Sequence, residues 1–453
     1  FALPSISSGR CLVESKPLPT LIKLDKNMVI TFLVLLAVLM LVGTPIFIAL
    51  AGSVTVAMGS FSHIPLAIVA ERLFAGLDKF PLMAIPFFIL TGSLMSAGGL
   101  SQRIIRLANL LVGRFTGGMG MTAVSASMFF GAISGSSPAT VVSVGSLLYP
   151  AMRKEGYSGQ FSIGVLVSAG SLGIIIPPSV VMIVYAAVTG VSVGALFMAG
   201  VGAGLLYAAC LLPYCWYRAK KDGVTPVEPP SWGEVLAGFK DASWGLGVPL
   251  VVLGGIYLGI FTPTEAAAVS VVYALLVSAL IYREKSFAEL FQSMIEAATT
   301  TAQVMIILAA ASVLAWFLSS NGLAAMLANA ILSLSENPYH IFLLINVTVL
   351  IAGMFLDASS IIVILAPLFY TVGMRVGIDP VHLGAVLTVN GAIGMFTPPF
   401  GLNLFVAGTI NGVDYVQAVR GALPFIGIAL FALILLTYIP AISMWLPSVV
   451  YGG

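Results

Sequence analysis

The sequence predicts an all-α polytopic membrane protein with two inverted repeats, each containing a re-entrant helical hairpin and a proline-broken helix. Of the 453 residues, 59% are hydrophobic and only 8% are charged, whereas about a quarter of the residues of a soluble domain are charged. Long uncharged stretches are punctuated by Gly and Pro, which membrane helices tolerate when neighbours satisfy the freed backbone groups. Two parts of the chain also share one pattern of Gly and Pro.

Residues 1–27 differ from the rest because they are rich in charge, Ser and Pro. Met28 opens the first apolar run, so we expect the native start there and interpret residues 1–27 as a leader, a linker, a tag or the remnant of a fused partner. The net charge is +2 without a polybasic block, so no nucleic-acid partner is expected. Cys11, Cys210 and Cys215 have no metal-binding spacing.

Ten apolar segments are predicted to span the bilayer. They are residues 28–43, 45–60, 82–97, 160–190, 193–217, 244–261, 264–282, 298–320, 383–410 and 421–446. Two more, 117–152 and 339–372, are interrupted by polar clusters and are predicted to be re-entrant hairpins. Residues 101–114 and 286–297 place their charges on one side of a helical period, so they are predicted to be interfacial helices, either arms between domains or padding of loops.

The distribution of Lys and Arg predicts the orientation. If residues 98–115, 153–155, 218–243, 283–297 and 411–420 face the cytoplasm, that side holds twelve Lys and Arg residues. The other side of the body then holds only Arg72, Lys79 and Arg375. With this orientation the first hairpin opens to the cytoplasm and the second to the outside. The repeats are therefore predicted to be inverted.

The repeat is clearest where residues 153–190 align with residues 374–411 at a constant shift of 221 positions. The matched pairs are Gly156 with Gly377, Gly170 with Gly391, Gly173 with Gly394, and Pro177-Pro178 with Pro398-Pro399. Inverted repeats with broken helices are typical of secondary transporters, and the breaks mark the binding site.

The two Pro-Pro pairs predict unpaired backbone oxygens, because proline lacks the N–H that would bond to the carbonyl four residues earlier. Four carbonyls should lose their helical partner, those of Gly173, Ile174, Gly394 and Met395. Such groups are costly in a bilayer unless a partner coordinates them. A sodium ion, which takes oxygen ligands, would satisfy them. The alternative is a kink packed against a neighbour or bridged by water.

Polar residues stand at the tips of the two predicted hairpins. In the first tip, residues 134–138, Ser precedes Pro as an N-cap does, so a half-helix with free N–H groups should begin there and attract an anion. In the second tip, residues 356–360, Asp357 takes the place of Ser136. It is the only carboxylate inside a long apolar stretch, so a functional role is expected. An N-cap carboxylate is the compatible structural alternative.

The remaining candidates are weaker. Asn390 and Asn403 flank the second break and are predicted either to pack helices or to line the site. Glu265 fits a structural capping box, and His63, His340 and His382 are isolated. The sequence contains no HExxH, GxSxG or Walker motif, so neither an enzyme nor an ATPase is expected, and an ion gradient should supply the energy.

Five runs together closely resemble the large subunit of TRAP transporters, which are tripartite ATP-independent periplasmic carriers of bacteria and archaea. The runs are residues 80–101, 128–152, 170–179, 259–269 and 353–369, and the resemblance covers residues 28–446. It implies an elevator carrier in the bacterial inner membrane that takes up organic acid anions, such as four-carbon dicarboxylates and sialic acid. It also implies two protein partners, a small four-helix membrane subunit and a periplasmic substrate-binding protein.

The resemblance further implies a sodium ion between each hairpin tip and the facing break. The first set of ligands would be Ser134, Ser137, Gly173, Ile176 and Pro178, and the second Gly353, Asp357, Gly394, Thr397 and Pro399. The organic anion would lie between the tips, where the candidate contacts are Ser136, Ser359, Ser360, Asn390 and Asn403.

An elevator-type architecture divides the chain into two bodies. The scaffold would comprise residues 28–81, residues 191–297 with connecting and arm helices, and residues 411–453 with the C-terminal helix. The transport domain would comprise residues 82–190 and 298–410. The alternatives are a binding-protein-independent sodium/anion symporter of related fold and an ion channel; a membrane enzyme has no motif in its favour.

Overall fold

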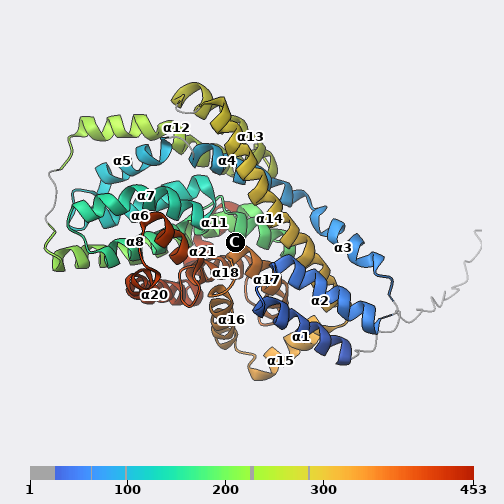
Figure 1. Ribbon diagram of the computed structural model, residues 1–453. Coiled ribbons are helices and arrows are strands. Elements are labelled where there is room, and N and C mark those ends of the chain that lie inside the picture. The colour runs from blue at the N-terminus through green and yellow to red at the C-terminus, as the bar shows by residue number, and fades with distance from the viewer. Residues whose placement is uncertain (1–25, 63, 97–98, 225–228, 284–285, 453) are drawn as a thin grey trace, which may run out of the picture.

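The computed structural model describes residues 26–452, except for residues 63, 97–98, 225–228 and 284–285 (Figure 1). His63 and residues 1–25 of the predicted leader therefore lie outside the described residues. All regular structure in the described part of the chain is helical, without a strand. The predicted all-α class is confirmed.

The first half of the chain contains a helical hairpin and a broken helix, with further helices before and after them. Its elements are α1 (Lys26–Leu41), α2 (Ile46–Phe61), α3 (Ala67–Leu77), the short 3-10 helix η1 (Phe80–Met83), α4 (Ala84–Ser96), α5 (Leu100–Val112), α6 (Gly118–Ser134), α7 (Ser137–Lys154), α8 (Gly159–Gly170), α9 (Leu172–Ile175), α10 (Val180–Thr189) and α11 (Val193–Lys221). Helices α6 and α7 are the predicted first hairpin, and α8 to α10 are the first broken helix, bent by 43° at its break.

The second half repeats this order. Its elements are α12 (Trp232–Tyr257), α13 (Pro263–Leu276) with the short π-helix η2 (Val277–Tyr282), α14 (Phe287–Ser320), α15 (Leu323–Leu334), α16 (Pro338–Gly353), α17 (Ala358–Arg375), α18 (Pro380–Gly394), α19 (Leu402–Asn411), α20 (Tyr415–Tyr438) and α21 (Ala441–Tyr451). Helices α16 and α17 form the second hairpin, and α18 and α19 are the two parts of the second broken helix.

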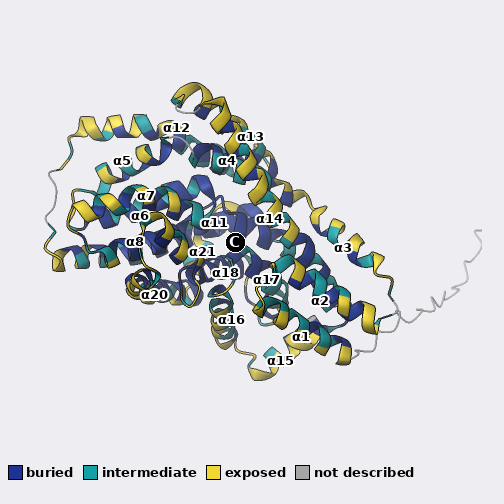
Figure 2. Ribbon diagram, in the orientation of Figure 1, coloured by how far each residue is buried: buried dark blue, intermediate teal, exposed yellow. Residues whose placement is uncertain are grey.

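The helices suit a lipid environment. Six of the described helices are long and apolar enough to cross a membrane, or up to nine spans if each bent helix pair is counted as one. Figure 2 shows buried residues concentrated in the central helices and exposed ones on outer helices such as α1, α12 and α13. Large apolar side chains are exposed there, including Leu41, Leu250 and Val272. Lipid tails would cover such side chains.

Two sequence predictions about helix boundaries are wrong. The single predicted span 421–446 is divided into α20 and α21, because Pro440 stands at the junction and cannot donate the N–H that would continue α20. The predicted interfacial helix 286–297 is the first part of the 34-residue helix α14, which begins at a capping box formed by Ser286 and Glu289. Its apolar continuation after residue 297 gave no signal for a helix end.

The two repeats pack across each other at the centre of the molecule. Helix α10 packs against α17, and α19 packs against α7, so the second part of each broken helix lies along the hairpin of the other repeat. The hydroxyl of Ser171 donates a hydrogen bond of 3.0 Å to the carbonyl of Ala392. These two positions are equivalent under the 221-residue shift, so corresponding points of the two copies meet there.

Helices α11 and α20 pack on the broken helices. Helix α20 has an extensive contact with α8, and α11 contacts α6, α9 and α18. Glycines permit the close approach of α8 and α20, since a Cβ on Gly164 would lie 2.1 Å from the carbonyl oxygen of Gly421. The predicted domain boundaries at residues 190 and 410 thus fall between helices that pack together, and the division into scaffold and transport domain stays a prediction.

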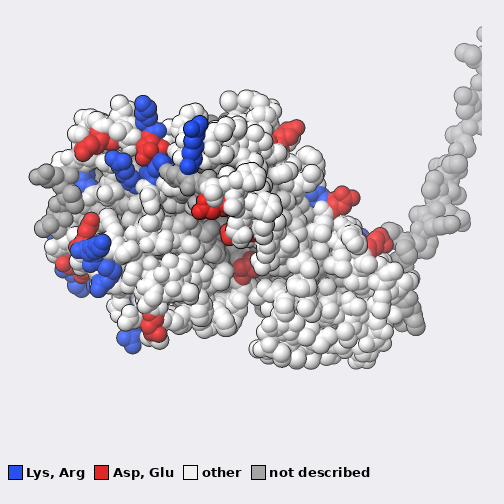
Figure 3. Space-filling model, turned by 45° about the horizontal axis from the view of Figure 1, so that its top comes forward, with Lys and Arg blue, Asp and Glu red and all other residues white. Residues whose placement is uncertain are grey.

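Charged side chains are unevenly distributed over the surface. In Figure 3, Lys and Arg gather at the side of the molecule formed by α5 to α8 and α12, and a large area of the visible face is almost uncharged. Within the charged region, Arg103 of α5 forms an ion pair of 3.0 Å with Asp241 of α12. An uncharged area of this kind is a surface that lipid tails would cover, and the orientation in the membrane stays a prediction.

Candidate functional site

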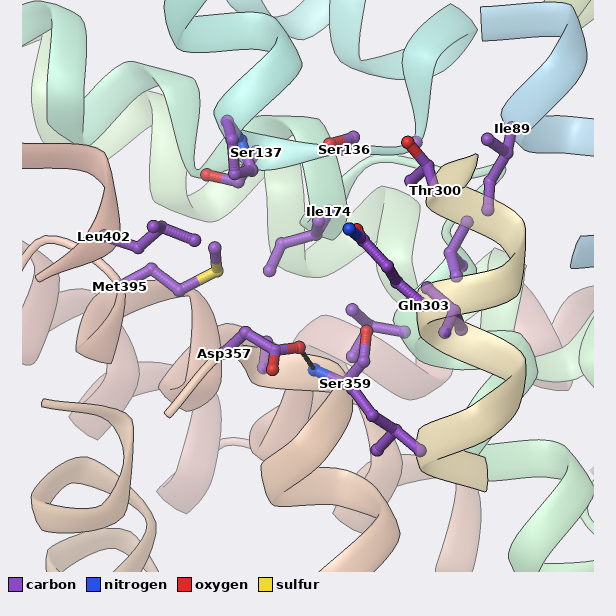
Figure 4. Close-up of a pocket in the computed structure, with 17 residues that line it drawn as sticks. Ile89, Ser136, Ser137, Ile174, Thr300, Gln303, Asp357, Ser359, Met395 and Leu402 are labelled. Carbon is purple, nitrogen blue, oxygen red and sulfur yellow. Dashed lines mark hydrogen bonds between the residues drawn. The ribbon is translucent and has the colours of Figure 1, made fainter. Parts of the chain in front are cut away.

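The tips of both hairpins and both helix breaks line one cavity of about 340 Å³ (Figure 4). The first tip contributes Ser136 and Ser137, and the second contributes Asp357 and Ser359. The breaks contribute Ile174, Val180, Val181, Met395 and Leu402. Four segments far apart in the sequence thus meet at one place, as the repeat predicted.

The first tip leaves the N-terminus of α7 open. Helix α6 ends at Ser134 because Gly135 adopts a left-handed conformation with φ of 60°, which glycine accommodates readily. The side chain of Ser136, the residue before α7, makes no capping hydrogen bond. The first N–H groups of α7 and the positive end of its dipole are therefore available to an anion.

The second tip differs because its helix is already capped by a carboxylate. Asp357 accepts hydrogen bonds from the N–H groups of Ser359 and Ser360 at 3.0 and 3.2 Å, and from the hydroxyl of Ser360. The structural alternative for Asp357 is thus confirmed, and the same residue also lines the cavity. One side of the cavity offers a positive helix end and the other a negative side chain, and no Lys or Arg is among the described residues that line it.

The prediction of four bare carbonyls is wrong for three of them. The carbonyl of Ile174 accepts from the hydroxyl of Ser179 at 2.6 Å, that of Gly394 from the N–H of Thr397 at 3.0 Å, and that of Met395 from the N–H of Asn403 at 2.8 Å. The chain folds back within each break and brings new donors to these oxygens. Each carbonyl oxygen retains a second lone pair, so coordination of a cation remains a prediction.

We expect Ser179→Ala to destabilise the protein, because it removes the donor from the buried carbonyl of Ile174. An unsatisfied buried acceptor costs about 1–3 kcal/mol. Thermal unfolding of the purified protein in detergent checks this. Ser448→Ala is the control, since Ser448 also donates to a carbonyl, that of Trp445, but lies exposed. Equal melting temperatures for the two variants would contradict the prediction.

The structure brings each predicted set of sodium ligands together in space. A Cβ on Gly173 would lie 2.5 Å from the carbonyl oxygen of Ser136, and a Cβ on Gly394 would lie 2.5 Å from the Cα of Gly353. Tip and break are thus in direct contact in both repeats. Their role as sodium ligands stays a prediction.

Individual members of these sets have other contacts as well. Ser137 is fully buried, and the hydroxyls of Ser134 and Thr140 lie 3.1 Å apart. Ile176 packs against Gly204 of α11, and the carbonyl of Pro178 faces Gly135. The Thr397 hydroxyl donates to the carbonyl of Ile393, and the carbonyl of Pro399 accepts from the hydroxyl of Tyr415.

The predicted substrate contacts divide into two groups. Ser136 and Ser359 line the cavity. Ser360, Asn390 and Asn403 are fully buried and are not among the residues that line it. The Asn390 amide donates to Asn346 of α16, with an N–O distance of 2.9 Å to the backbone carbonyl.

Sequence reasoning missed the wall that α14 contributes. Thr300, Gln303, Val304 and Ile307 lie on one stripe of this helix and line the cavity. In Figure 4 the amide of Gln303 projects into the space between the two tips. The available signal was the polar run from Thr299 to Gln303 inside an uncharged stretch.

The family comparison agrees with this arrangement. A family model described as "Tripartite ATP-independent periplasmic transporter, DctM component" matches residues 33–442. The chain belongs to this family. DctM proteins are transporters of the inner membrane, so the predicted location and the prediction that the chain is a transporter and not an enzyme are confirmed.

Several DctM relatives align over most of the chain. It is 43% identical to the C4-dicarboxylate TRAP transporter large permease protein of Pseudomonas aeruginosa, with 88% of this chain and 93% of the relative covered. Identity to the protein of the same name from Rhodobacter capsulatus is 40%, with coverage of 91% and 97%. The sialic acid TRAP transporter large permease of Vibrio cholerae is 35% identical, with coverage of 84% and 90%.

Two solved transporter structures share the fold of this DctM protein. The YdaH transporter of Alcanivorax borkumensis superimposes with a TM-score of 0.61 at 17% identity, covering 91% of this chain and 98% of that chain. MtrF of Neisseria gonorrhoeae superimposes with a TM-score of 0.55 at 13% identity, covering 94% and 96%. At these identities the likeness concerns the fold alone.

Proposed function

We propose that this DctM protein imports an organic acid anion, that sodium drives the uptake, and that a periplasmic binding protein delivers the acid. The observation that carries the proposal is the single cavity between the open N-terminus of α7 and the carboxylate of Asp357. A carboxylate of the substrate would bind the first N–H groups of α7. A sodium ion beside Asp357 would balance the negative charge on the opposite side.

The polarity of the cavity supports coupling between the two solutes. A second negative charge close to Asp357 is repelled unless a cation lies nearby. Because no described Lys or Arg lines the cavity, sodium would supply that positive charge. Organic acid and ion would then bind better together than alone, which is the thermodynamic requirement for symport.

The substrate class rests on size and on the relatives. A volume of about 340 Å³ lies within the range of small-molecule sites. Relatives at 35–43% identity include proteins named for C4-dicarboxylates and for sialic acid. We propose one of these two kinds of acid for this chain, together with a small four-helix membrane subunit and the periplasmic binding protein as partners. One relative, the isethionate TRAP transporter permease protein DctMQ of Oleidesulfovibrio alaskensis, is longer than this chain, which covers 65% of its length.

Alternating access would follow an elevator movement with boundaries different from those the sequence suggested. Helix α4 packs against α13, and α14 packs against α2 and α3, so these helices form one group. Helices α11 and α20 pack on the broken helices instead. We therefore place α6–α11 and α16–α20 in the moving body, and α14 on the scaffold wall that it slides past.

Uptake into proteoliposomes tests the proposal. We expect accumulation of succinate, L-malate or N-acetylneuraminate only with an inward sodium gradient and with the binding protein of the same organism added outside. Uptake without any binding protein would favour the independent symporter. Flux that does not saturate with substrate would favour a channel. Equal uptake with a sodium or a potassium gradient would contradict sodium coupling.

A further inference from the structure

We propose that Asn403 couples the two hairpin–break sites, so that sodium binds to them cooperatively. This inference rests on the proposed sodium coupling. Asn403 lies in the first turn of α19, beyond the second break, and is fully buried. Because α19 packs along α7, this residue of the second repeat reaches the tip of the first.

The backbone and the side chain of Asn403 bond to different repeats. Its backbone N–H donates to the carbonyl of Met395 at 2.8 Å, inside the second break. Its side-chain amide donates to the hydroxyl of Ser137 at 2.8 Å, at the first hairpin tip, and to the carbonyl of Val167 in α8 at 3.4 Å. Ser137 and Asn403 are 266 positions apart. One residue therefore ties the second break to the first tip and to the first broken helix.

The side-chain oxygen of Asn403 lacks, within the described part of the chain, the hydrogen bond that a buried polar atom needs. This atom is buried and has no hydrogen-bond partner among the described residues. Buried polar atoms are nearly always satisfied. A sodium ion bound at the first tip beside Ser137 would satisfy the oxygen, and the amide nitrogen would still hold the Ser137 hydroxyl in place.

No described residue of the first repeat makes the corresponding connection. Its corresponding carbonyl, that of Ile174, is satisfied by the hydroxyl of Ser179 only five residues later. The first break is therefore closed within its own repeat, whereas the second is closed by a residue that also holds the first tip. Ordering of the second break by sodium would fix α19 and Asn403, and thereby preorganise the first tip. Coupling through one shared, ordered residue gives positive cooperativity.

Sodium-dependent thermal unfolding of the full chain in detergent or nanodiscs tests the coupling without a substrate. NaCl is titrated at constant ionic strength with choline chloride, and the midpoint and the Hill coefficient of the stabilisation are measured. For the unaltered protein we expect a Hill coefficient clearly above one. For Asn403→Leu we expect a coefficient of about one and a midpoint at least tenfold higher, since both the tie and the oxygen are lost.

Asn321→Leu is the matched control. Asn321 is also a buried asparagine, and its side-chain amide donates to the carbonyl of Phe317 at 2.8 Å. It follows the C-terminus of α14 and belongs to neither a hairpin tip nor a break. We expect Asn321→Leu to lower the melting temperature in choline chloride but to leave the sodium midpoint and the Hill coefficient unchanged. Asn403→Ala replaces Asn403→Leu if the larger side chain prevents folding.

The outcomes separate the two claims. If the unaltered protein shows no response to sodium, the proposed sodium coupling fails. If it responds with a Hill coefficient of one, or if the Asn403 variants match Asn321→Leu in midpoint and coefficient, only the coupling role of Asn403 is refuted.

Discussion

Asp357→Asn is expected to lower sodium-driven uptake by about a hundredfold, which corresponds to roughly 3 kcal/mol. Asparagine caps a helix as well as aspartate does, so α17 should still begin at residue 358. Only the negative charge facing the cavity is lost. That charge is the only one on the cavity wall within the described residues. Its loss should therefore chiefly lower the affinity for sodium. Initial rates at several sodium concentrations measure this.

Asp379→Asn is the control for the loss of a capping carboxylate. Asp379 caps α18 with the same geometry, accepting from the N–H groups of Val381 and His382 at 2.8 and 2.9 Å. It is not among the residues that line the cavity. We expect uptake within about twofold of the unaltered protein for this variant, because surface substitutions away from a site have small effects. Comparable losses in both variants would show that Asp357 acts as a cap alone.

Gly173→Ala is expected to destabilise the protein by about 1–3 kcal/mol, because the added methyl group overpacks the site, and to reduce uptake by more than about tenfold. The added Cβ would lie 2.3 Å from the hydroxyl oxygen of Thr140 and 2.5 Å from the carbonyl oxygen of Ser136. The second contact is with backbone, so the first hairpin tip must move away from its break. Thermal unfolding and uptake should therefore both respond.

Gly254→Ala in α12 is the control for adding a methyl group to a membrane helix. Nothing lies within 4 Å of a Cβ at this position. Alanine favours a helix over glycine by up to about 1 kcal/mol, so stability should stay equal or rise. A Gly173→Ala protein that transports and unfolds like the Gly254→Ala protein would show that tip and break are not in contact in the working transporter.

Much of the fold could be predicted because its signals are local. The first hairpin, expected over 117–152, comprises α6 and α7 over 118–154, with its turn at the polar cluster that indicated it. The cap at Asp357 follows from residue type and spacing alone. The boundary between α20 and α21 also has a local signal, because Pro440 lies between them.

The composition of the site depended on contacts that no local pattern contains. Gln303 and Thr300 reach the cavity because α14 passes beside both tips. Asn403 faces Ser137 across 266 positions. Asn390, which looked equivalent to Asn403, instead bonds to α16. Helix periodicity indicates the side of a helix on which a residue lies, but not the helix that it meets.

The sequence by itself determined most of the helices, their breaks, the two repeats and the one carboxylate at a hairpin tip, because Pro, Gly and capping residues act on the backbone within a few positions. The tertiary structure alone decided which of the freed carbonyls stay unpaired, which helices line the cavity and which residue ties the second break to the first hairpin tip. An oxygen left by a proline remains bare only if no other donor reaches it, and in the second break two backbone N–H groups do.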